Sequence, residues 1–128
     1  VANVILENGK PKVKKVVCAV DCGIVVNPDA AVNLMEGGVV DGIGHAMFGD
    51  FTFENGRPLD DNFNTYRLIK MSEAPEVEAY FAQNTNNPTG LGEPSLPPAG
   101  GAVANAIYRA TGERLYSQPF VKRLELMG

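Results

Sequence analysis

A single glutamate in a loop rich in glycine and proline is the residue best placed to do chemistry. Glu93 follows Gly90-Leu91-Gly92 and is followed at once by Pro94. Glycine lets a backbone pass close to a bulky neighbour and proline restricts the residues beside it, so the carboxylate is held at a defined position. It also precedes an expected helix, whose N-terminus favours negative charge. A positioned carboxylate serves as a general base or a metal ligand, and the plainer alternative is a turn whose glutamate is only solvated.

The other reactive side chains indicate no second catalytic site. His45, the only histidine, lies in a glycine-rich stretch without an obvious nucleophile, so we expect a polar helix position. Cys18 and Cys22 would lie ~13 Å apart on one strand, too far for a disulfide. We interpret both as small buried hydrophobic residues and expect no metal site in this chain.

The first expected elements are a hairpin and a central strand. Residues 1–21 form two β-rich runs around Asn8-Gly9, which favours a type I′ turn. The second run, residues 13–20, is apolar on both faces, as in a covered central strand. Lysines cluster in this hairpin, which we interpret as a solvated edge strand protected from pairing: Lys10, Lys12, Lys14 and Lys15.

A long helix is expected to begin at Asn27-Pro28, with Asn as N-cap and Pro at the first helical position. Its apolar stripe has helical spacing and consists of Ala31, Leu34, Met35, Val39, Ile43, Ala46 and Met47. Gly49 ends it. Glycines inside the helix cost about 1 kcal/mol each relative to Ala, which indicates close approach of a packed element or of a cofactor: Gly37, Gly38, Gly42 and Gly44.

The second half of the chain adds short strands and one more helix. We expect a hairpin turning at Asn55-Gly56, a strand over residues 66–71, and an alternating strand over 76–81 with one buried and one wet face. Glu73, Glu76 and Glu78 are assigned to an exposed strand face. A final helix over 97–111 stops at Gly112 and has a stripe of small residues: Ala99, Ala102, Val103, Ala106, Ile107 and Ala110.

This order of elements predicts an α+β fold, with a mixed or antiparallel sheet built from hairpins and two helices packed on it. The length of 128 residues allows one domain, residues 1–128. The net charge of -4 argues against a nucleic-acid partner. No apolar run approaches the ~20 residues of a membrane helix. No signal peptide is visible and the first residue is Val, so we expect the chain to start inside a longer gene product.

Three motifs, by their order and spacing, resemble the molybdenum hydroxylases, the family of xanthine dehydrogenase and aldehyde oxidase. They are Asp21-Cys22-Gly23-Ile24-Val25-Val26-Asn27-Pro28, Met35-Glu36-Gly37-Gly38-Val39-Val40-Asp41-Gly42-Ile43-Gly44 and Gly90-Leu91-Gly92-Glu93-Pro94. Within that family, residues 62–66, 73–78 and 102–106 look most like beta subunits of the isoquinoline 1-oxidoreductase type. The resemblance runs from about residue 4 to residue 120.

The resemblance implies a role for five residues. Glu93 matches the glutamate that acts as the base beside the molybdenum. Asn27, Ala31 and Leu34 match positions that contact the dinucleotide tail of the pterin, and Gly92 is assigned to the cofactor with them. Leu34 departs from the glutamine that relatives often carry there, and its apolar side chain cannot hydrogen-bond the cofactor.

The resemblance also implies an activity and partners. The enzyme would oxidise an N-heterocyclic aromatic or aldehyde carbon with oxygen derived from water, using a molybdenum-pterin cofactor expected in its cytosine dinucleotide form. Iron–sulfur clusters on a small partner subunit would take the electrons. The chain would be the C-terminal part of a bacterial large subunit and would share its cofactor with upstream domains. We therefore expect it to be inactive alone.

Two alternatives stay open at this point. One is a degenerate, non-catalytic structural or interaction module of the same fold, against which the intact Gly90-Leu91-Gly92-Glu93-Pro94 motif argues. The other is a hydrolase in which Glu93 activates water. A hydrolase of this kind needs a second placed carboxylate or a metal cluster, and no spacing in the chain singles one out.

Overall fold

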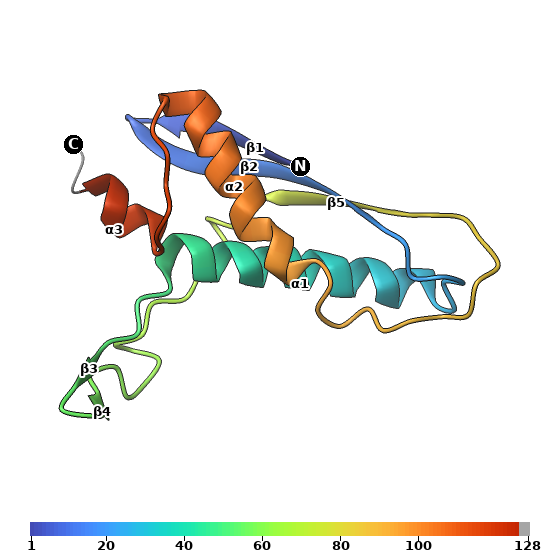
Figure 1. Ribbon diagram of the computed structural model, residues 1–128, viewed down its shortest axis with the longest axis horizontal. Coiled ribbons are helices and arrows are strands. Elements are labelled where there is room, and N and C mark those ends of the chain that lie inside the picture. The colour runs from blue at the N-terminus through green and yellow to red at the C-terminus, as the bar shows by residue number, and fades with distance from the viewer. Residues whose placement is uncertain (126–128) are drawn as a thin grey trace.

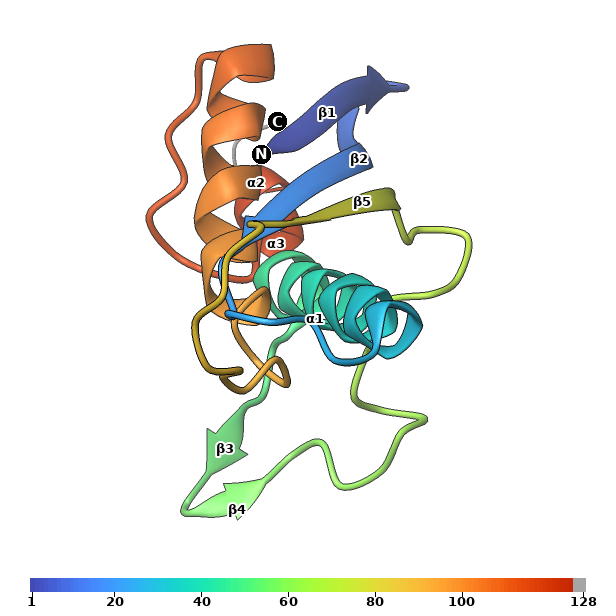
Figure 2. The same ribbon diagram turned by 90° about the vertical axis from the view of Figure 1, so that its right-hand side faces the viewer.

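The computed structural model describes residues 1–125, in which two long helices lie on one side of a three-stranded sheet (Figures 1 and 2). Helix α2 (Leu96–Thr111) packs against β1 (Ala2–Glu7), and helix α1 (Pro28–Phe48) packs against β5 (Glu76–Phe81). The elements are β1 (Ala2–Glu7), β2 (Lys10–Val20), α1 (Pro28–Phe48), β3 (Phe53–Glu54), β4 (Arg57–Pro58), β5 (Glu76–Phe81), α2 (Leu96–Thr111) and α3 (Phe120–Glu125). The expected α+β class and the mixed sheet are confirmed.

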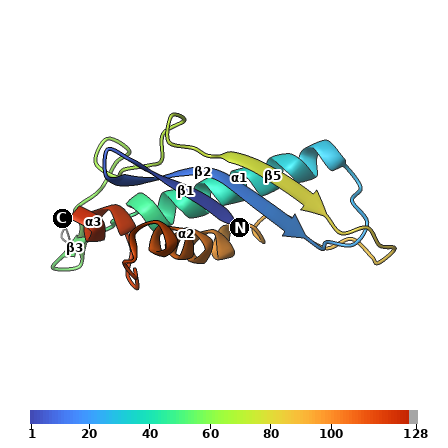
Figure 3. The same cartoon turned by 90° about the horizontal axis from the view of Figure 1, so that it is seen from above.

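The sheet order is β1-β2-β5, with β2 antiparallel to β1 and parallel to β5. Asn8 and Gly9 have φ of 53° and 77°, as the predicted type I′ turn requires. The prediction of a central second strand is confirmed, and Figure 3 shows β2 between its two neighbours. The interpretation of the lysine-rich strand as an edge is wrong at Lys15, because β5 pairs with β2 from that residue onward and places Glu76 and Glu78 within reach of Lys15. Residues 10–14 of β2 lie outside the ladder with β5.

Helix α1 begins where the sequence predicts. The Asn27 side chain accepts a hydrogen bond of 3.1 Å from the Ala30 amide, and Pro28 is the first helical residue. The predicted stripe is buried except for Leu34, which is 45% exposed, so its assignment to the core is wrong. A Cβ built at Gly42 would lie 2.5 Å from the carbonyl oxygen of Leu96, so a packed helix explains this glycine.

The predicted strand over residues 66–71 is absent, because local side-chain interactions hold this segment in an irregular path. The Arg67 guanidinium lies 3.5 Å from the centre of the Phe48 ring and hydrogen-bonds Glu73. Glu73 also accepts a hydrogen bond of 2.9 Å from the Lys70 amide. The preceding hairpin, β3 with β4, is confirmed as a short ladder.

The later elements follow the prediction with four differences. Ala110, expected on the stripe of the last long helix, is exposed. Helix α2 begins at Leu96, one residue early, and ends at Gly112 in a left-handed conformation with φ of 80°. Strand β5 alternates less cleanly than predicted, because Glu78 is half-buried with its apolar neighbours. The short α3 was not predicted, and it packs the buried ring of Phe120 into the core.

The core lies between the sheet and the helices. It consists of Val13, Val16, Val39, Ile43, Ala46, Met47, Ala99, Val103, Ile107, Leu115 and Phe120. Cys22 is buried, Cys18 is half-buried, and both are free thiols. The two do not share a strand as expected, because β2 ends at Val20. Among residues 1–125 no helix is both long and apolar enough to cross a membrane.

Candidate functional site

Two loops lie side by side at the N-terminal end of α1 (Figure 1). The first joins β2 to α1 over residues 21–27, and the second joins β5 to α2 over residues 82–95. Two backbone hydrogen bonds connect them, from the Ile24 amide to the Asn86 oxygen (3.1 Å) and from the Thr89 amide to the Cys22 oxygen (2.9 Å). The parallel pairing of β2 with β5 makes this meeting unavoidable, because both strands end at the same edge of the sheet.

A glycine and an aspartate fasten the crossing of the two loops. Gly23 has a φ of +72°, and a Cβ built there would overlap the carbonyl oxygen of Asn87. The Asp21 carboxylate accepts hydrogen bonds from the Gly23 amide (3.2 Å) and from the Asn84 side chain (2.7 Å). The first loop thus fixes the path of the second, which carries Glu93.

A hollow of about 200 Å³ lies between the loops and the first turns of α1. It is lined by Cys22, Ile24, Val25, Val26, Asn27, Ala30, Ala31, Leu34, Pro88, Thr89 and Leu91. Three residues assigned to the cofactor from sequence, Asn27, Ala31 and Leu34, therefore lie around one hollow. Gly92 and Glu93 are exposed and follow directly on its lining residue Leu91, without lining it themselves.

The border of the hollow combines a helix start with exposed apolar side chains. The N-terminus of a long helix carries roughly half a positive charge and favours an anion. Ile24, Val26 and Leu34 are 48%, 80% and 45% exposed. Sequence reasoning did not single out Ile24 or Val26. The sequence signal for these two residues is the apolar run 24–26, which lacks the helical or strand periodicity that would place its side chains in the core.

The turn that carries Glu93 is fastened at its base. The Leu96 amide donates a hydrogen bond of 3.1 Å to the Glu93 carbonyl oxygen. The Ser95 hydroxyl donates another, also of 3.1 Å, to the carbonyl oxygen of Met35 in α1. Ser95 is 2% exposed, whereas the side chain of Glu93 faces solvent. The backbone beneath the carboxylate is thus held while the carboxylate itself stays accessible.

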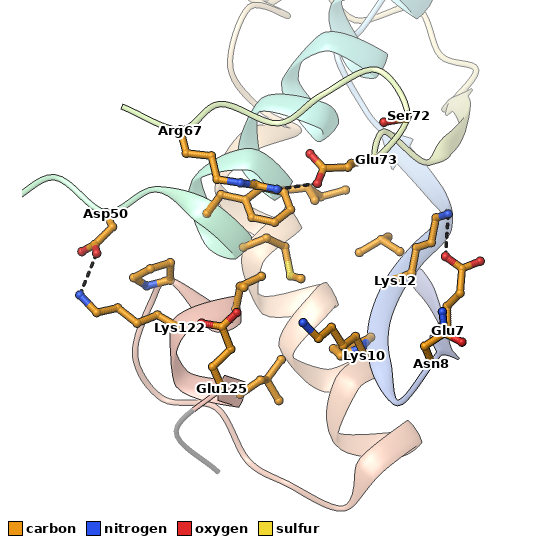
Figure 4. A pocket seen from close by; sticks show the side chains of 18 of the residues that line it. Glu7, Asn8, Lys10, Lys12, Asp50, Arg67, Ser72, Glu73, Lys122 and Glu125 are labelled. Atoms are coloured by element: carbon orange, nitrogen blue, oxygen red, sulfur yellow. Dashed lines mark hydrogen bonds and ion pairs between the residues drawn. The ribbon is translucent and has the colours of Figure 1, made fainter. Parts of the chain in front are cut away.

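A larger hollow of about 1200 Å³ lies at the opposite end of α1 (Figure 4). Its border carries exposed ion pairs, including Lys12–Glu7 at 3.0 Å and Lys122–Asp50 at 2.8 Å. None of the site residues expected from sequence lines it. We therefore assign the candidate site to the smaller hollow, where those residues converge.

Glu73, Glu76, Glu78 and His45 do not form one site, because these side chains contact different neighbouring residues. The Lys15 ammonium hydrogen-bonds Glu78 and Glu76, which raises the pKa of Lys15, and its hydrogen bond to Glu78 holds the pKa of that carboxyl below its usual range. Burial raises the pKa of Glu73, but hydrogen bonds from the Lys70 amide and Arg67 outweigh it, so the pKa is lowered.

His45 is 54% exposed and lies 3.6 Å from the Asp41 carboxylate, at a polar position on α1 as predicted. Within residues 1–125, no three His, Cys, Asp or Glu side chains form a group that could hold a metal ion.

Comparison with known proteins decides the family. Residues 2–75 match the model of the molybdopterin cofactor-binding domain. The chain belongs to this family. The resemblance to the molybdenum hydroxylases expected from the three motifs is thereby confirmed.

Two curated relatives and one solved structure illustrate this membership. The membrane-bound aldehyde dehydrogenase [pyrroloquinoline-quinone] of Gluconacetobacter polyoxogenes is 39% identical over 83% of the chain and 14% of its own length. Isoquinoline 1-oxidoreductase subunit beta of Brevundimonas diminuta is 33% identical over 90% of the chain and 15% of its own length. The reconstituted CO dehydrogenase of Oligotropha carboxidovorans superposes with a TM-score of 0.73 at 19% identity, covering 96% and 17% of the two chains, and shows the shared fold. The chain thus spans about a seventh of the curated relatives that it matches.

The hollow is smaller than a usual ligand pocket and would hold only a part of a molybdopterin cofactor. Ligand pockets usually measure ~300–1,000 Å³, more than the 200 Å³ found here. The helix start at its border suits an anionic group such as a phosphate. Gly92 does not line the hollow, and a Cβ built there meets no atom within 4 Å, so packing among the described residues does not require glycine at this position.

Proposed function

We propose that residues 1–128 form one domain, the C-terminal piece of the molybdenum-binding large subunit of a hydroxylase. They supply its catalytic base, Glu93, and part of its cofactor pocket. The observation that carries this proposal is the convergence of Asn27, Ala31 and Leu34 on the hollow whose other wall, residues 88–91, leads directly to Glu93. The family membership adds to it.

Each residue has a defined task in this proposal. The bound cofactor supplies a metal that acidifies a water-derived hydroxyl and accepts two electrons. A carboxylate oxygen of Glu93 would take the proton of the water-derived oxygen that adds to an electron-poor substrate carbon. The C–H bond broken at that carbon would give its two electrons to the metal and its proton to water. Asn27 caps the start of α1, whose free amides would hold the anionic tail of the cofactor. Gly92, assigned to the cofactor by the family resemblance, would leave room for it beside the base.

The substrate class follows from the chemistry that such a base supports. The attacked carbon is electron-poor, as in an aldehyde or next to the nitrogen of an aromatic ring. The names of the two relatives, an aldehyde dehydrogenase and an isoquinoline oxidoreductase, include both kinds. Oxidation of N-heterocycles and aldehydes by the purified enzyme tests this point. An enzyme active only in hydrolysis would contradict it.

The cofactor is proposed to be the cytosine dinucleotide form of the molybdenum pterin, shared with the rest of the large subunit. A small subunit carrying iron–sulfur clusters would drain the electrons. Metal and nucleotide analysis of the assembled complex should give molybdenum, iron and a cytosine nucleotide, and the complex should be brown. Pyrroloquinoline quinone without molybdenum, as the name of one relative would suggest, would overturn the assignment.

The 128-residue chain by itself should be inactive and hold little or no cofactor, because its hollow accommodates only part of one. Metal analysis of the isolated chain after exposure to the cofactor tests the shared pocket. Stoichiometric molybdenum in the isolated chain would contradict it. A fully loaded complex that oxidises no substrate of either kind would favour the degenerate, non-catalytic module instead.

A further inference from the structure

Ser95 connects the loop of the base to the helix of the hollow. Its hydroxyl is buried, at 2% residue exposure, and donates to the carbonyl oxygen of Met35 over 3.1 Å, joining residues 60 apart in sequence. A carbonyl oxygen has two lone pairs, so Met35 can accept this bond beside its helical one. A buried hydroxyl without a hydrogen-bond partner is unfavourable, so Ser95 is stable only where its hydroxyl reaches the Met35 carbonyl oxygen. We call this contact the anchor of the loop.

Gly38 makes room for this anchor. A Cβ built at Gly38 would overlap the Ser95 hydroxyl oxygen, so the hydroxyl occupies the place of a side chain on α1. The neighbouring Gly37 is different, because a Cβ built there meets no atom within 4 Å. One helix therefore carries two adjacent glycines, of which only one contacts the loop of the base.

The anchor lies close to the carboxylate in sequence and in structure. Only Pro94 separates Ser95 from Glu93, and proline leaves this link little freedom. The turn is closed by the hydrogen bond from the Leu96 amide to the Glu93 carbonyl. The helix that receives the Ser95 hydroxyl is also the one that presents Asn27, Ala31 and Leu34 to the hollow.

We infer that Ser95 is a positioning residue, whose hydrogen bond to the Met35 carbonyl, in the space left by Gly38, sets the place of Glu93 relative to the cofactor side of α1. This inference rests on the proposed function, because it concerns the proposed base. Ser95 itself touches neither substrate nor cofactor in this arrangement.

Two substitutions remove the anchor by different routes, and a third is their control. Ser95→Ala deletes the donor, and Gly38→Ala places a methyl group where the hydroxyl lies. Gly37→Ala makes the same change one residue away, with the same gain in helix propensity but no contact. All three are made in the assembled enzyme, and rates are expressed per bound molybdenum.

Ser95→Ala and Gly38→Ala should lower kcat about ten- to hundred-fold, the effect of misplacing a catalytic group by about 1 Å. KM should change by less than about three-fold, because the substrate walls are untouched. Gly37→Ala should keep the kcat of the parent. Amide hydrogen exchange, which does not depend on turnover, should become faster over residues 90–96 in the first two variants and stay unchanged in the third.

Combination with Glu93→Gln separates the two claims. If Ser95 acts through the base, Ser95→Ala should cause no further loss of kcat in the Glu93→Gln enzyme. A Glu93→Gln enzyme with parental kcat would overturn the proposed function. A Glu93→Gln enzyme that has lost its activity, while Ser95→Ala and Gly38→Ala keep parental kcat and exchange, would overturn the positioning role alone. An equal loss from Ser95→Ala in both backgrounds would overturn it too.

Discussion

Gly23 passes so close beneath the carbonyl oxygen of Asn87 that a Cβ at this position would overlap it. The residue also has a φ of +72°, which L side chains rarely adopt. Two independent constraints thus select glycine where the loop after β2 crosses the loop after β5. This crossing closes one side of the candidate cofactor hollow.

Gly23→Ala should therefore destabilise the chain by more than its backbone strain, which costs about 1–3 kcal/mol. The added methyl must also push residues 86 and 87 away, so the hollow should open and cofactor occupancy should fall. Urea unfolding of the 128-residue chain and molybdenum content of the assembled enzyme measure the two effects. Gly9→Ala is the control, because Gly9 has a similar φ of +77° but nothing within 4 Å of a built Cβ. Equal losses of stability in both variants would contradict the close approach at Gly23.

Asn27 has a structural and a proposed functional task that two variants separate. Asn27→Ala removes the hydrogen bond to the Ala30 amide and should destabilise the chain by about 1 kcal/mol. Asn27→Asp keeps the cap and the fold but adds a negative charge beside the proposed anionic tail. It should leave the urea midpoint unchanged and lower cofactor occupancy. Full occupancy in Asn27→Asp would count against a phosphate at this helix start.

Gly92 should tolerate alanine in the fold and not in the assembled site. Its built Cβ meets no atom of the chain, so Gly92→Ala should leave the unfolding free energy unchanged while lowering molybdenum content or activity of the complex. Gly42→Ala gives the opposite pattern: its Cβ would lie 2.9 Å from the Ala99 Cβ, and the crowding should cost about 1–3 kcal/mol. A fully active, fully loaded Gly92→Ala enzyme would remove Gly92 from the cofactor site.

The ion pairs between β2 and β5 should make stability depend on pH. The pKa of Glu78 is lowered in the folded chain, so its contribution is present above the ordinary value of 4.5 and is lost as pH falls through the folded pKa. The pKa of Lys15 is raised, so its contribution is present below 10.5 and is lost as pH rises through the folded pKa. The pair is therefore at full strength between these two values.

Between pH 7 and pH 3 the Lys15→Met chain should lose less stability than the parent chain. In this variant the protonation of Glu78 no longer breaks an ion pair. Urea midpoints across this range measure the difference. Lys14→Met is a matched control at an exposed lysine of the same strand, and it should keep the slope of the parent. A Lys15→Met chain with an unchanged slope would show that the pairing does not stabilise the sheet.

Local signals in the sequence predicted most of the elements. Asn8-Gly9 and Asn27-Pro28 each require one backbone geometry, and both the turn and the helix start lie where they were expected. The prediction of a strand over residues 66–71 was wrong. Its apolar pattern suggested a strand, whereas hydrogen bonds from Arg67 and Lys70 to Glu73 hold the segment in another path. Lys15 was misinterpreted as part of an edge because its two partners, Glu76 and Glu78, lie 61 and 63 residues away.

The candidate site was predictable in its residues and not in its shape. The glycine- and proline-rich loop singled out Glu93, and the resemblance to the molybdenum hydroxylases added Asn27, Ala31 and Leu34. That Leu34 leaves the core for the hollow depends on the second loop, which only the pairing of β2 with β5 brings there. The anchor formed by Ser95 could not be predicted, because a serine before a helix ordinarily indicates no more than an N-cap.

The most direct test of this account is Glu93→Gln in the assembled enzyme, a near-isosteric change that removes the base. Molybdenum content and oxidation of N-heterocycles and aldehydes are measured on the same preparation. Full metal loading with kcat lowered by about 10²- to 10⁴-fold would place Glu93 at the chemistry. Full loading with activity near that of the parent would contradict the central claim and leave the loop of Glu93 with a structural role alone.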